Sequence, residues 1–313
     1  MKWKVLVSAP YMQPILGRFQ SELEEKGVEL VVPPVLERLE EIDLLNLMTD
    51  IDGVICGDDR FTRKVIESSP KLKVLSKWGT GIDSLDADAC AERGVVICRN
   101  PNAFSTPVAE SVLGYILCFT RKLLFMDRLM HRGIWEKIPG RVLEECTLGV
   151  IGVGDSGKAV ASRARALGMK VLGNDIKEMP QEFIELTDIR MVTKEQLLQE
   201  ADFVSLHTDL NTTSFHLMNR ERFALMRPDA YLLNLSRGPV VDEEALVEAL
   251  IEERISGAAL DVFEVEPPPL KSQLLKMDNV LLAPHNANSS ALYWERVHRN
   301  TIDNLMAVLE KSE

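Results

Sequence analysis

The sequence predicts an α/β fold of two domains, each built on a doubly wound parallel sheet. Its 313 residues amount to about twice a typical domain. The composition, 46% hydrophobic and 27% charged, is that of a globular chain and excludes extensive disorder. Short runs of Val, Ile and Leu alternate with helical patterns, which is typical of a parallel sheet covered on both faces.

The first hundred residues contain five short apolar runs separated by amphipathic segments. They predict strands at 4–8, 29–32, 52–56, 72–76 and 94–98. Strands that alternate with helices in this way favour a single α/β unit with a parallel sheet.

A helix is expected to open the second domain. Thr106 is a suitable N-cap and Pro107 a suitable first helical residue. Apolar residues then recur at the spacing of one buried helix face: Val108, Val112, Tyr115, Ile116 and Phe119. Further strands are predicted at 147–152, 170–174, 202–207, 231–236, 257–262 and 279–284. A single helix is expected from Ser289 to the C-terminus.

Charge and cysteine usage limit the partners and the compartment. Subtracting 48 acidic from 36 basic residues gives a net charge of −12, which repels polyanions, so we expect no nucleic acid partner. The five cysteines are odd in number and form no CxxC, which excludes a disulfide framework and favours a reducing compartment. The apolar stretch 112–119 is too short to cross a membrane. We therefore expect a cytoplasmic protein without a membrane partner.

The sharpest motif is a glycine loop, Gly152-Val153-Gly154-Asp155-Ser156-Gly157, between a predicted strand and a predicted helix. Its glycines permit a tight turn, close approach of backbone amides to a pyrophosphate, and close packing of helix on strand. The anion would then lie at the helix N-terminus. Because an acid aimed into the loop would repel phosphate, we expect Asp155 to point outward or to cap the helix.

An acid follows at the position that a dinucleotide site requires. Asp175 lies 23 residues after Gly152, at the end of the next predicted strand. A carboxylate there binds the adenosine ribose hydroxyls and disfavours the additional phosphate of NADP. The motif therefore predicts a Rossmann-type NAD site with the candidates Gly152, Gly154, Asp155, Ser156, Gly157 and Asp175.

Ionisable residues also follow three later strands of the same domain. Arg237, Asp261 and His285 each come directly after an apolar run, and Glu266 lies shortly beyond Asp261. Ligands of open α/β sheets bind at the carboxyl ends of the strands. Hydride transfer to a 2-oxo acid requires an arginine for the carboxylate, a histidine to exchange the carbonyl proton, and an acid to keep that histidine protonated.

On these motifs the chain resembles the D-isomer-specific 2-hydroxyacid dehydrogenase family over essentially its whole length. The likeness is carried by residues 77–86, 108–117, 149–157, 234–246, 259–268 and 279–286. The resemblance implies a Rossmann cofactor domain, residues 100–285, inserted into a flavodoxin-like substrate domain, residues 1–99 plus 286–313. It implies NAD as cofactor and a small 2-hydroxy or 2-oxo acid as substrate.

The resemblance also implies a role for individual residues. Arg237 would bind the substrate carboxylate, His285 would be the acid/base, and Glu266 would pair with His285 and raise its pKa. A loop of the substrate domain would meet the substrate carboxylate, and it contains Lys77, Trp78, Gly79 and Thr80. Asp261 would lie beside the nicotinamide. The other residues expected to contact the cofactor are His207, Thr208, Thr213, Ser236 and His285.

Alternatives remain open at this point. Residues 56–60 are more acidic than basic, which favours an unphosphorylated substrate, although Lys77 and Arg60 leave a phosphorylated one possible. A non-catalytic NAD-sensing protein, similar to the corepressors that share this scaffold, would retain the same residues. Formate-type dehydrogenases place a glutamine where Glu266 stands. The other histidines lack metal-ligand spacing, so no metal site is expected.

Residues 121–137 are unusually apolar. Their stripe is explained either by burial in the core or by an interface. In the family that the chain resembles, this helix and arm form a two-fold interface. We therefore expect a homodimer through residues 102–137.

Overall fold

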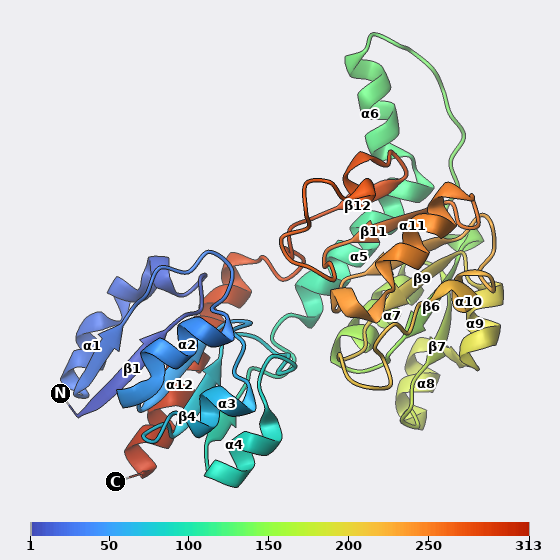
Figure 1. The fold of residues 1–313 in the computed structure, drawn as a ribbon. Helices are drawn as coiled ribbons and strands as arrows, with labels where there is room; N and C mark the ends of the chain where they lie inside the picture. The colour runs from blue at the N-terminus through green and yellow to red at the C-terminus, as the bar shows by residue number, and fades with distance from the viewer. Residues whose placement is uncertain (1, 313) are drawn as a thin grey trace. The chain divides into compact units, whose positions relative to one another are not determined.

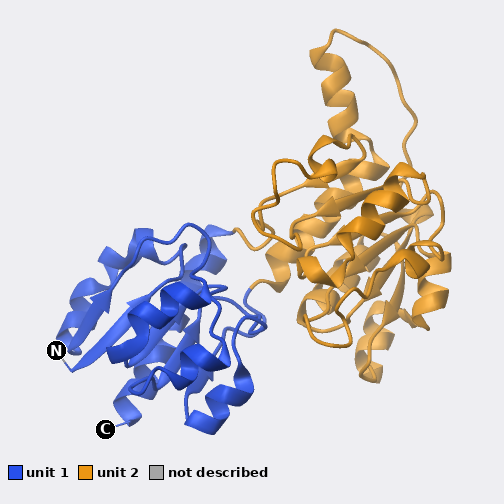
Figure 2. Cartoon of the chain, in the orientation of Figure 1, with its two compact units in different colours: residues 1–103, 290–313 blue, residues 104–289 orange. Residues whose placement is uncertain are grey.

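The computed structural model describes residues 2–312 and divides the chain into two compact units (Figure 2). The first unit comprises Met1–Ala103 and Ser290–Glu313, and the second comprises Phe104–Ser289. The second unit is thus an insertion in the first. The boundaries expected from the sequence, 99/100 and 285/286, lie four residues before those of the units.

The first unit contains a five-stranded parallel sheet in the order β2-β1-β3-β4-β5 (Figure 1). This is the flavodoxin-like order. Its strands are β1 (Trp3–Val7), β2 (Val28–Val31), β3 (Gly53–Cys56), β4 (Val74–Lys77) and β5 (Val96–Cys98). Its helices are α1 (Gln20–Glu25), α2 (Glu41–Leu47), α3 (Arg63–Glu67), α4 (Ala87–Arg93) and α12 (Ala291–Lys311).

The second unit contains a seven-stranded parallel sheet in the order β12-β11-β10-β9-β6-β7-β8. From its other edge this is the Rossmann order 3-2-1-4-5-6 with one more strand. Its strands are β6 (Thr147–Ile151), β7 (Lys170–Asn174), β8 (Arg190–Met191), β9 (Phe203–Leu206), β10 (Tyr231–Asn234), β11 (Gly257–Leu260) and β12 (Val280–Leu282). The two parallel sheets confirm the predicted fold class.

The helices of the second unit cover its sheet, apart from α6. They are α5 (Ser105–Thr120), α6 (Leu123–His131), α7 (Asp155–Ala166), α8 (Gln181–Thr187), α9 (Lys194–Glu200), α10 (Arg220–Phe223) and α11 (Glu243–Ile251). Short 3-10 turns occur at Gln13–Arg18, Met48–Asp50, Leu143–Glu145, Gly238–Val240 and Gln273–Lys276.

The inner strands are largely buried because both faces of each sheet are covered. Every residue of β3, β9 and β11 is buried. Strand β8 escaped the sequence analysis because its two residues are too few to form a pattern.

The start of α5 differs from the sequence expectation. Phe104 is its N-cap, and Thr106 lies inside the first turn, so the prediction of a Thr106 cap is wrong. The Thr106 hydroxyl instead accepts a hydrogen bond from Arg163 of α7 at 3.1 Å. Pro107 lies at the third helical position, where its missing N–H costs little because first-turn amides have no intrahelical partner.

Helix α6 contributes no residue to the core. It stands away from the rest of the second unit (Figure 1). Its apolar side chains are exposed, among them Leu123, Leu124, Phe125 and Met130. Burial in the core of one chain is therefore the wrong explanation for the stripe at 121–137.

No helix within residues 2–312 combines the length and the apolar composition needed to cross a bilayer.

The packing of α12 on β3 and β4 generates a stability prediction. Leu305 is fully buried, and a Cβ on Gly53 of β3 would lie 2.9 Å from its Cδ1 atom, so helix and strand are in close contact. We expect Leu305→Ala to lower the free energy of unfolding by about 2–5 kcal/mol through lost burial and a cavity. Urea denaturation measures the change. The matched control is Leu292→Ala on the exposed side of the same helix, expected within about 0.5 kcal/mol of the parent. Equal effects of the two variants would contradict the packing.

Candidate active site

The glycine loop joins β6 to α7, and its geometry explains two of its three glycines by packing. Gly152 has a φ of +90°, and a Cβ there would lie 2.6 Å from the His207 carbonyl oxygen. A Cβ on Gly157 would lie 2.0 Å from the carbonyl oxygen of Gly152. Both positions therefore exclude a side chain.

Gly154 is different, because nothing lies within 4 Å of where its Cβ would be. It is the N-cap of α7, and the space beside its Cα is open. The backbone amides of the first turn of α7, which have no partner within the helix, lie next to this space. Backbone donors and the helix dipole there attract an anion. The loop therefore fits the pyrophosphate of a dinucleotide.

The two acids among the cofactor candidates, Asp175 and Asp155, lie in different surroundings. The half-buried Asp175 follows β7, and its carboxylate accepts the Val153 amide at 2.6 Å and the Lys177 amide at 2.8 Å. Its remaining lone pairs are free for the hydroxyls of a ribose. Asp155 is exposed in the first turn of α7, where a negative charge is favourable to the helix. Ser156 is half-buried beside it.

The segment after β9 closes against the glycine loop. The His207 amide donates to the Ile151 carbonyl at 2.8 Å, and its Nε2 atom shares a hydrogen bond of 2.8 Å with the Ser205 hydroxyl. Burial lowers the pKa of His207 to about 4, so the ring is neutral near pH 7. The Thr208 hydroxyl oxygen is buried and has no hydrogen-bond partner within residues 2–312. Such an unpartnered polar atom beside Gly152 is consistent with a missing ligand.

Two further residues of the expected cofactor set hydrogen-bond to nearby asparagines. The Thr213 hydroxyl donates to Asn211 Oδ1 at 2.7 Å, and the Ser236 hydroxyl donates to Asn234 Oδ1 at 2.8 Å. Ser236 lies at the end of β10, at the same edge of the sheet as the glycine loop. Thr213 is exposed in the long connection between β9 and α10.

The strand order brings the candidate catalytic residues to one edge of the second unit. Strands β10, β11 and β12 are neighbours and run parallel. Arg237, Glu266 and His285 follow the carboxyl ends of these three strands in turn. The glycine loop follows β6 at the same edge.

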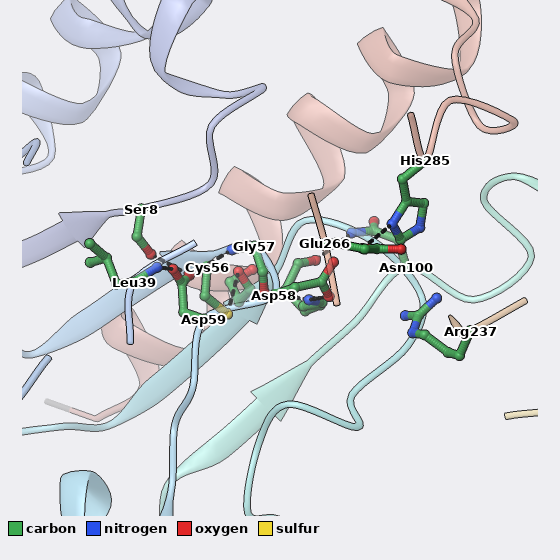
Figure 3. A network of polar contacts seen from close by, with 12 residues as sticks. Ser8, Leu39, Cys56, Gly57, Asp58, Asp59, Asn100, Arg237, Glu266 and His285 are labelled. Carbon is green, nitrogen blue, oxygen red and sulfur yellow. Dashed lines mark hydrogen bonds and ion pairs between the residues drawn. The ribbon is translucent and has the colours of Figure 1, made fainter. Parts of the chain in front are cut away.

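Glu266 and His285 form a hydrogen-bonded pair. Glu266 Oε2 lies 3.1 Å from His285 Nδ1, and the two side chains are 20% and 23% exposed (Figure 3). The other carboxylate oxygen, Oε1, accepts the Phe263 amide at 3.0 Å. The carboxylate is therefore held by the backbone through Oε1 and lies against the imidazole through Oε2.

Asp261 holds the segment that carries His285. Its buried carboxylate accepts the Asn286 amide at 2.7 Å and the Ala287 amide at 2.9 Å, and its carbonyl accepts the His285 amide at 2.7 Å. Burial raises the pKa of Asp261. These contacts hold His285 at a φ of +50°, which is uncommon for a residue with a side chain.

Arg237 is positioned by the turn after β10. Its carbonyl accepts the Asn234 side-chain amide at 2.9 Å, and its Nη1 donates to the Ser236 carbonyl at 2.9 Å. A Cβ on the next residue, Gly238, would lie 1.8 Å from the Phe263 carbonyl oxygen. The Arg237 turn is therefore packed directly on the segment that leads to Glu266.

The remaining predicted residues, Lys77, Trp78, Gly79 and Thr80, form a group in the first unit at the end of β4. The buried Lys77 ammonium donates to the Gly57 carbonyl and to Asp58 Oδ1, the latter at 2.5 Å. The Trp78 indole donates to His298 Nδ1 at 2.9 Å, and the Thr80 hydroxyl donates to the Asn100 carbonyl at 2.8 Å. Gly79 has a φ of +139°.

Two groups of residues were missed by sequence reasoning. The buried Asp59 accepts hydrogen bonds from Ser8, Gly57 and Leu39 and so fixes the loop after β3 (Figure 3). In the second unit, His216, Asp242 and Glu264 place one ligand atom each within 4.8 Å of one another. Their sequence separation gave no signal, because only the fold brings these segments together.

Known proteins resemble this chain over most of its length. Residues 113–287 match the family model of the D-isomer specific 2-hydroxyacid dehydrogenase NAD binding domain. A glyoxylate reductase of Thermofilum pendens is 37% identical over 275 residues, 86% of this chain and 81% of that protein. A D-3-phosphoglycerate dehydrogenase of Methanocaldococcus jannaschii is 36% identical over 291 residues, 92% of this chain and 54% of that protein. A solved D-lactate dehydrogenase from Aquifex aeolicus, complexed with NAD and lactic acid, has a TM-score of 0.89 and 27% identity, covering 98% of this chain and 96% of that one.

The glycine loop generates a binding prediction. Gly157→Ala forces a methyl group into the Gly152 carbonyl, whereas Gly154→Ala has room in the protein but occupies the space open to a phosphate. We expect both variants to raise the Kd for NAD at least about tenfold. Isothermal titration calorimetry measures the Kd.

Gly114→Ala on α5, where the Cβ also meets nothing within 4 Å, is the matched control and is expected to bind as the parent does. Unchanged binding by Gly154→Ala would show that the open side of the loop does not receive the cofactor.

Proposed function

This chain belongs to the D-isomer specific 2-hydroxyacid dehydrogenases, and we propose that it interconverts a small, unphosphorylated D-2-hydroxy acid and its 2-oxo acid with NAD. The observation that carries the proposal is the Glu266–His285 pair, at 3.1 Å, on the sheet edge that also bears the glycine loop. The related proteins differ in the substrate that their names give, so the choice of acid rests on the residues of this chain.

His285 is the proposed acid/base. NAD, when bound over the glycine loop, supplies the nicotinamide that takes or gives the hydride. In reduction, protonated His285 gives its proton to the carbonyl oxygen of the 2-oxo acid, and in oxidation the neutral ring removes the proton of the hydroxyl group. Glu266 fixes the ring through Nδ1 and stabilises the protonated form, because a carboxylate beside an imidazole favours the charged state.

Arg237 is the proposed anchor for the substrate carboxylate. A guanidinium binds a carboxylate through two parallel N–H bonds, which fixes the orientation of the carbonyl as well as its position. The protein has a net charge of −12, so its overall field does not attract an anion. The attraction must therefore be local, and Arg237 supplies it.

The charge around Lys77 supports an unphosphorylated substrate. The ammonium group is buried and already paired with Asp58 at 2.5 Å. A phosphate would need a cation whose charge is still available, and the charge of Lys77 is already paired. Residues 77–80 are proposed to meet the substrate through backbone amides rather than through this lysine.

The test of the function is a panel of 2-oxo acids assayed for oxidation of NADH, beside NADPH. We expect turnover of small unphosphorylated acids, a preference for NADH because of Asp175, and the lowest kcat/KM for phosphorylated acids. His285→Asn is expected to reduce kcat by about 10²–10⁴-fold, since it removes the proton donor.

The free energy of unfolding of the His285→Asn variant serves as the control and is expected to change little, because asparagine also tolerates a positive φ. Bound NAD without turnover of any acid in the panel would overturn the enzyme proposal and favour an NAD-sensing binding protein.

A homodimer through residues 102–137 is part of the proposal. Six apolar side chains of α6 and the segment after it are exposed: Leu123, Leu124, Phe125, Met130, Ile134 and Trp135, the last being 81% exposed. Contiguous exposed apolar residues mark interaction sites. A second copy of the chain would cover them.

A cytoplasmic location, favoured by five cysteines that are all unpaired, completes the proposal.

Light scattering after size exclusion tests the dimer. We expect twice the mass of one chain at micromolar concentration, and the mass of one chain for the double variant Phe125→Glu with Trp135→Glu, which places charges on the apolar surface. Leu186→Glu, on the equally exposed Leu186 of α8, is the control and should stay dimeric. A parent protein that runs as a monomer would refute this interface.

A further inference from the structure

A hollow of about 550 Å³ lies on the first unit, outside the edge that carries Lys77 and Trp78. It is lined by Asp52, Pro70, Lys71, Leu72, Lys73, Arg93, Gly94, Val96, Val308 and Ser312. These residues lie around the amino ends of β3, β4 and β5, at the end of α4 and at the carboxyl end of α12. The substrate of an open α/β sheet binds at the carboxyl ends, so this hollow is a different place.

The hollow gathers three cations. Lys71, Lys73 and Arg93 line it, and none of them forms an ion pair within residues 2–312. Several other cations of the same unit are paired, such as Arg18 with Glu295 at 2.7 Å and Arg299 with Glu22 at 2.8 Å. In a chain with twelve more acidic than basic residues, carboxylates to pair with these three are abundant. Their absence here leaves the hollow positively charged.

The acidic residues nearby are already engaged. Asp52 is the one carboxylate in the lining, and its Oδ2 atom accepts the Lys4 amide at 2.9 Å. Asp50 pairs with the Lys4 ammonium at 2.7 Å, and Lys71 acts on it through space, helping to lower the pKa of Asp50. Three cations against one carboxylate leave the lining with a net charge of +2.

The dipole of a helix explains the position of only one of the three cations. Arg93 lies in the last turn of α4, where a positive charge is favourable to the helix dipole. Lys71 and Lys73 lie on the connection between α3 and β4 and have no helix end of their own to stabilise. Lys73, which is half-buried, packs over the Trp3 ring with its ammonium 5.3 Å from the ring centre, a contact that does not neutralise its charge.

The same hollow has an apolar side. Pro70, Leu72, Val96 and Val308 line it, and Val96 is 44% exposed although it belongs to a strand. A volume of about 550 Å³ lies within the range of small-molecule sites. A ligand that uses both sides carries an anionic group for the cations and an apolar body for these side chains.

We propose that this hollow binds a small phosphate monoester that carries an apolar ring or chain. Lys and Arg recognise phosphate through charge and through directed N–H donors. The site is separate from the proposed substrate and cofactor residues, so its occupancy does not depend on hydride transfer.

Calorimetric titration of the full chain tests the proposal, with NAD saturating so that the glycine loop does not compete. The probes are phenyl phosphate, inorganic phosphate and phenol. We expect phenyl phosphate to bind most tightly, phosphate more weakly, and phenol not at all up to about 10 mM. The double variant Lys71→Gln with Lys73→Gln is expected to raise the Kd for phenyl phosphate at least about tenfold.

Lys170→Gln with Lys276→Gln removes the same charge from exposed positions of the second unit and should leave the Kd unchanged. Arg93→Gln, at an exposed position, is a second variant should the double one fail to fold, and it too should weaken binding. The kcat/KM for a 2-oxo acid should be the same in all these variants. Absent binding, or equal Kd values in the parent and in the Lys71 and Lys73 variant, would overturn the site.

Discussion

The buried carboxylate of Asp261 is the contact on which the candidate site depends. It receives two consecutive backbone amides, those of Asn286 and Ala287, and its carbonyl receives that of His285. These bonds keep His285 in a left-handed conformation that a histidine rarely adopts by itself. The ring can then meet Glu266. Asp261 thus acts through the backbone of its neighbours, and each of its carboxylate oxygens accepts one backbone amide.

Parallel strand pairing turns this local arrangement into a site. Because β10, β11 and β12 run side by side in one direction, three residues that are far apart in sequence emerge at one edge. The β6–α7 turn emerges at the same edge, and Gly152 and Gly157 allow the close backbone contacts that this turn requires. The parallel sheet therefore brings these residues together, because each of them follows the carboxyl end of its own strand.

Much of this could be predicted from the sequence because the relevant signals are local. The glycine loop, Asp175 and the strand-end positions of Arg237 and His285 can be located by counting along the chain. Contacts between distant side chains could not be predicted: nothing in the sequence pairs Lys77 with Asp58, or gathers His216, Asp242 and Glu264. The prediction of Thr106 as the N-cap was wrong because the N-cap is Phe104, two residues earlier. Thr106 has the more suitable side chain, but it lies inside the first turn. The apolar pattern of α6 has the same period whether its face meets a core or a second molecule.

The insertion of one unit into the other has a consequence for the order in which the chain acquires structure as it is made. The second unit is complete once residue 289 has been synthesised. The first unit is not, because α12, which packs on β3, β4 and β5, follows the second unit in the chain. Until α12 leaves the ribosome, the part of the earlier sheet that it covers has no cover, and the apolar side chains there remain open to water or to a chaperone.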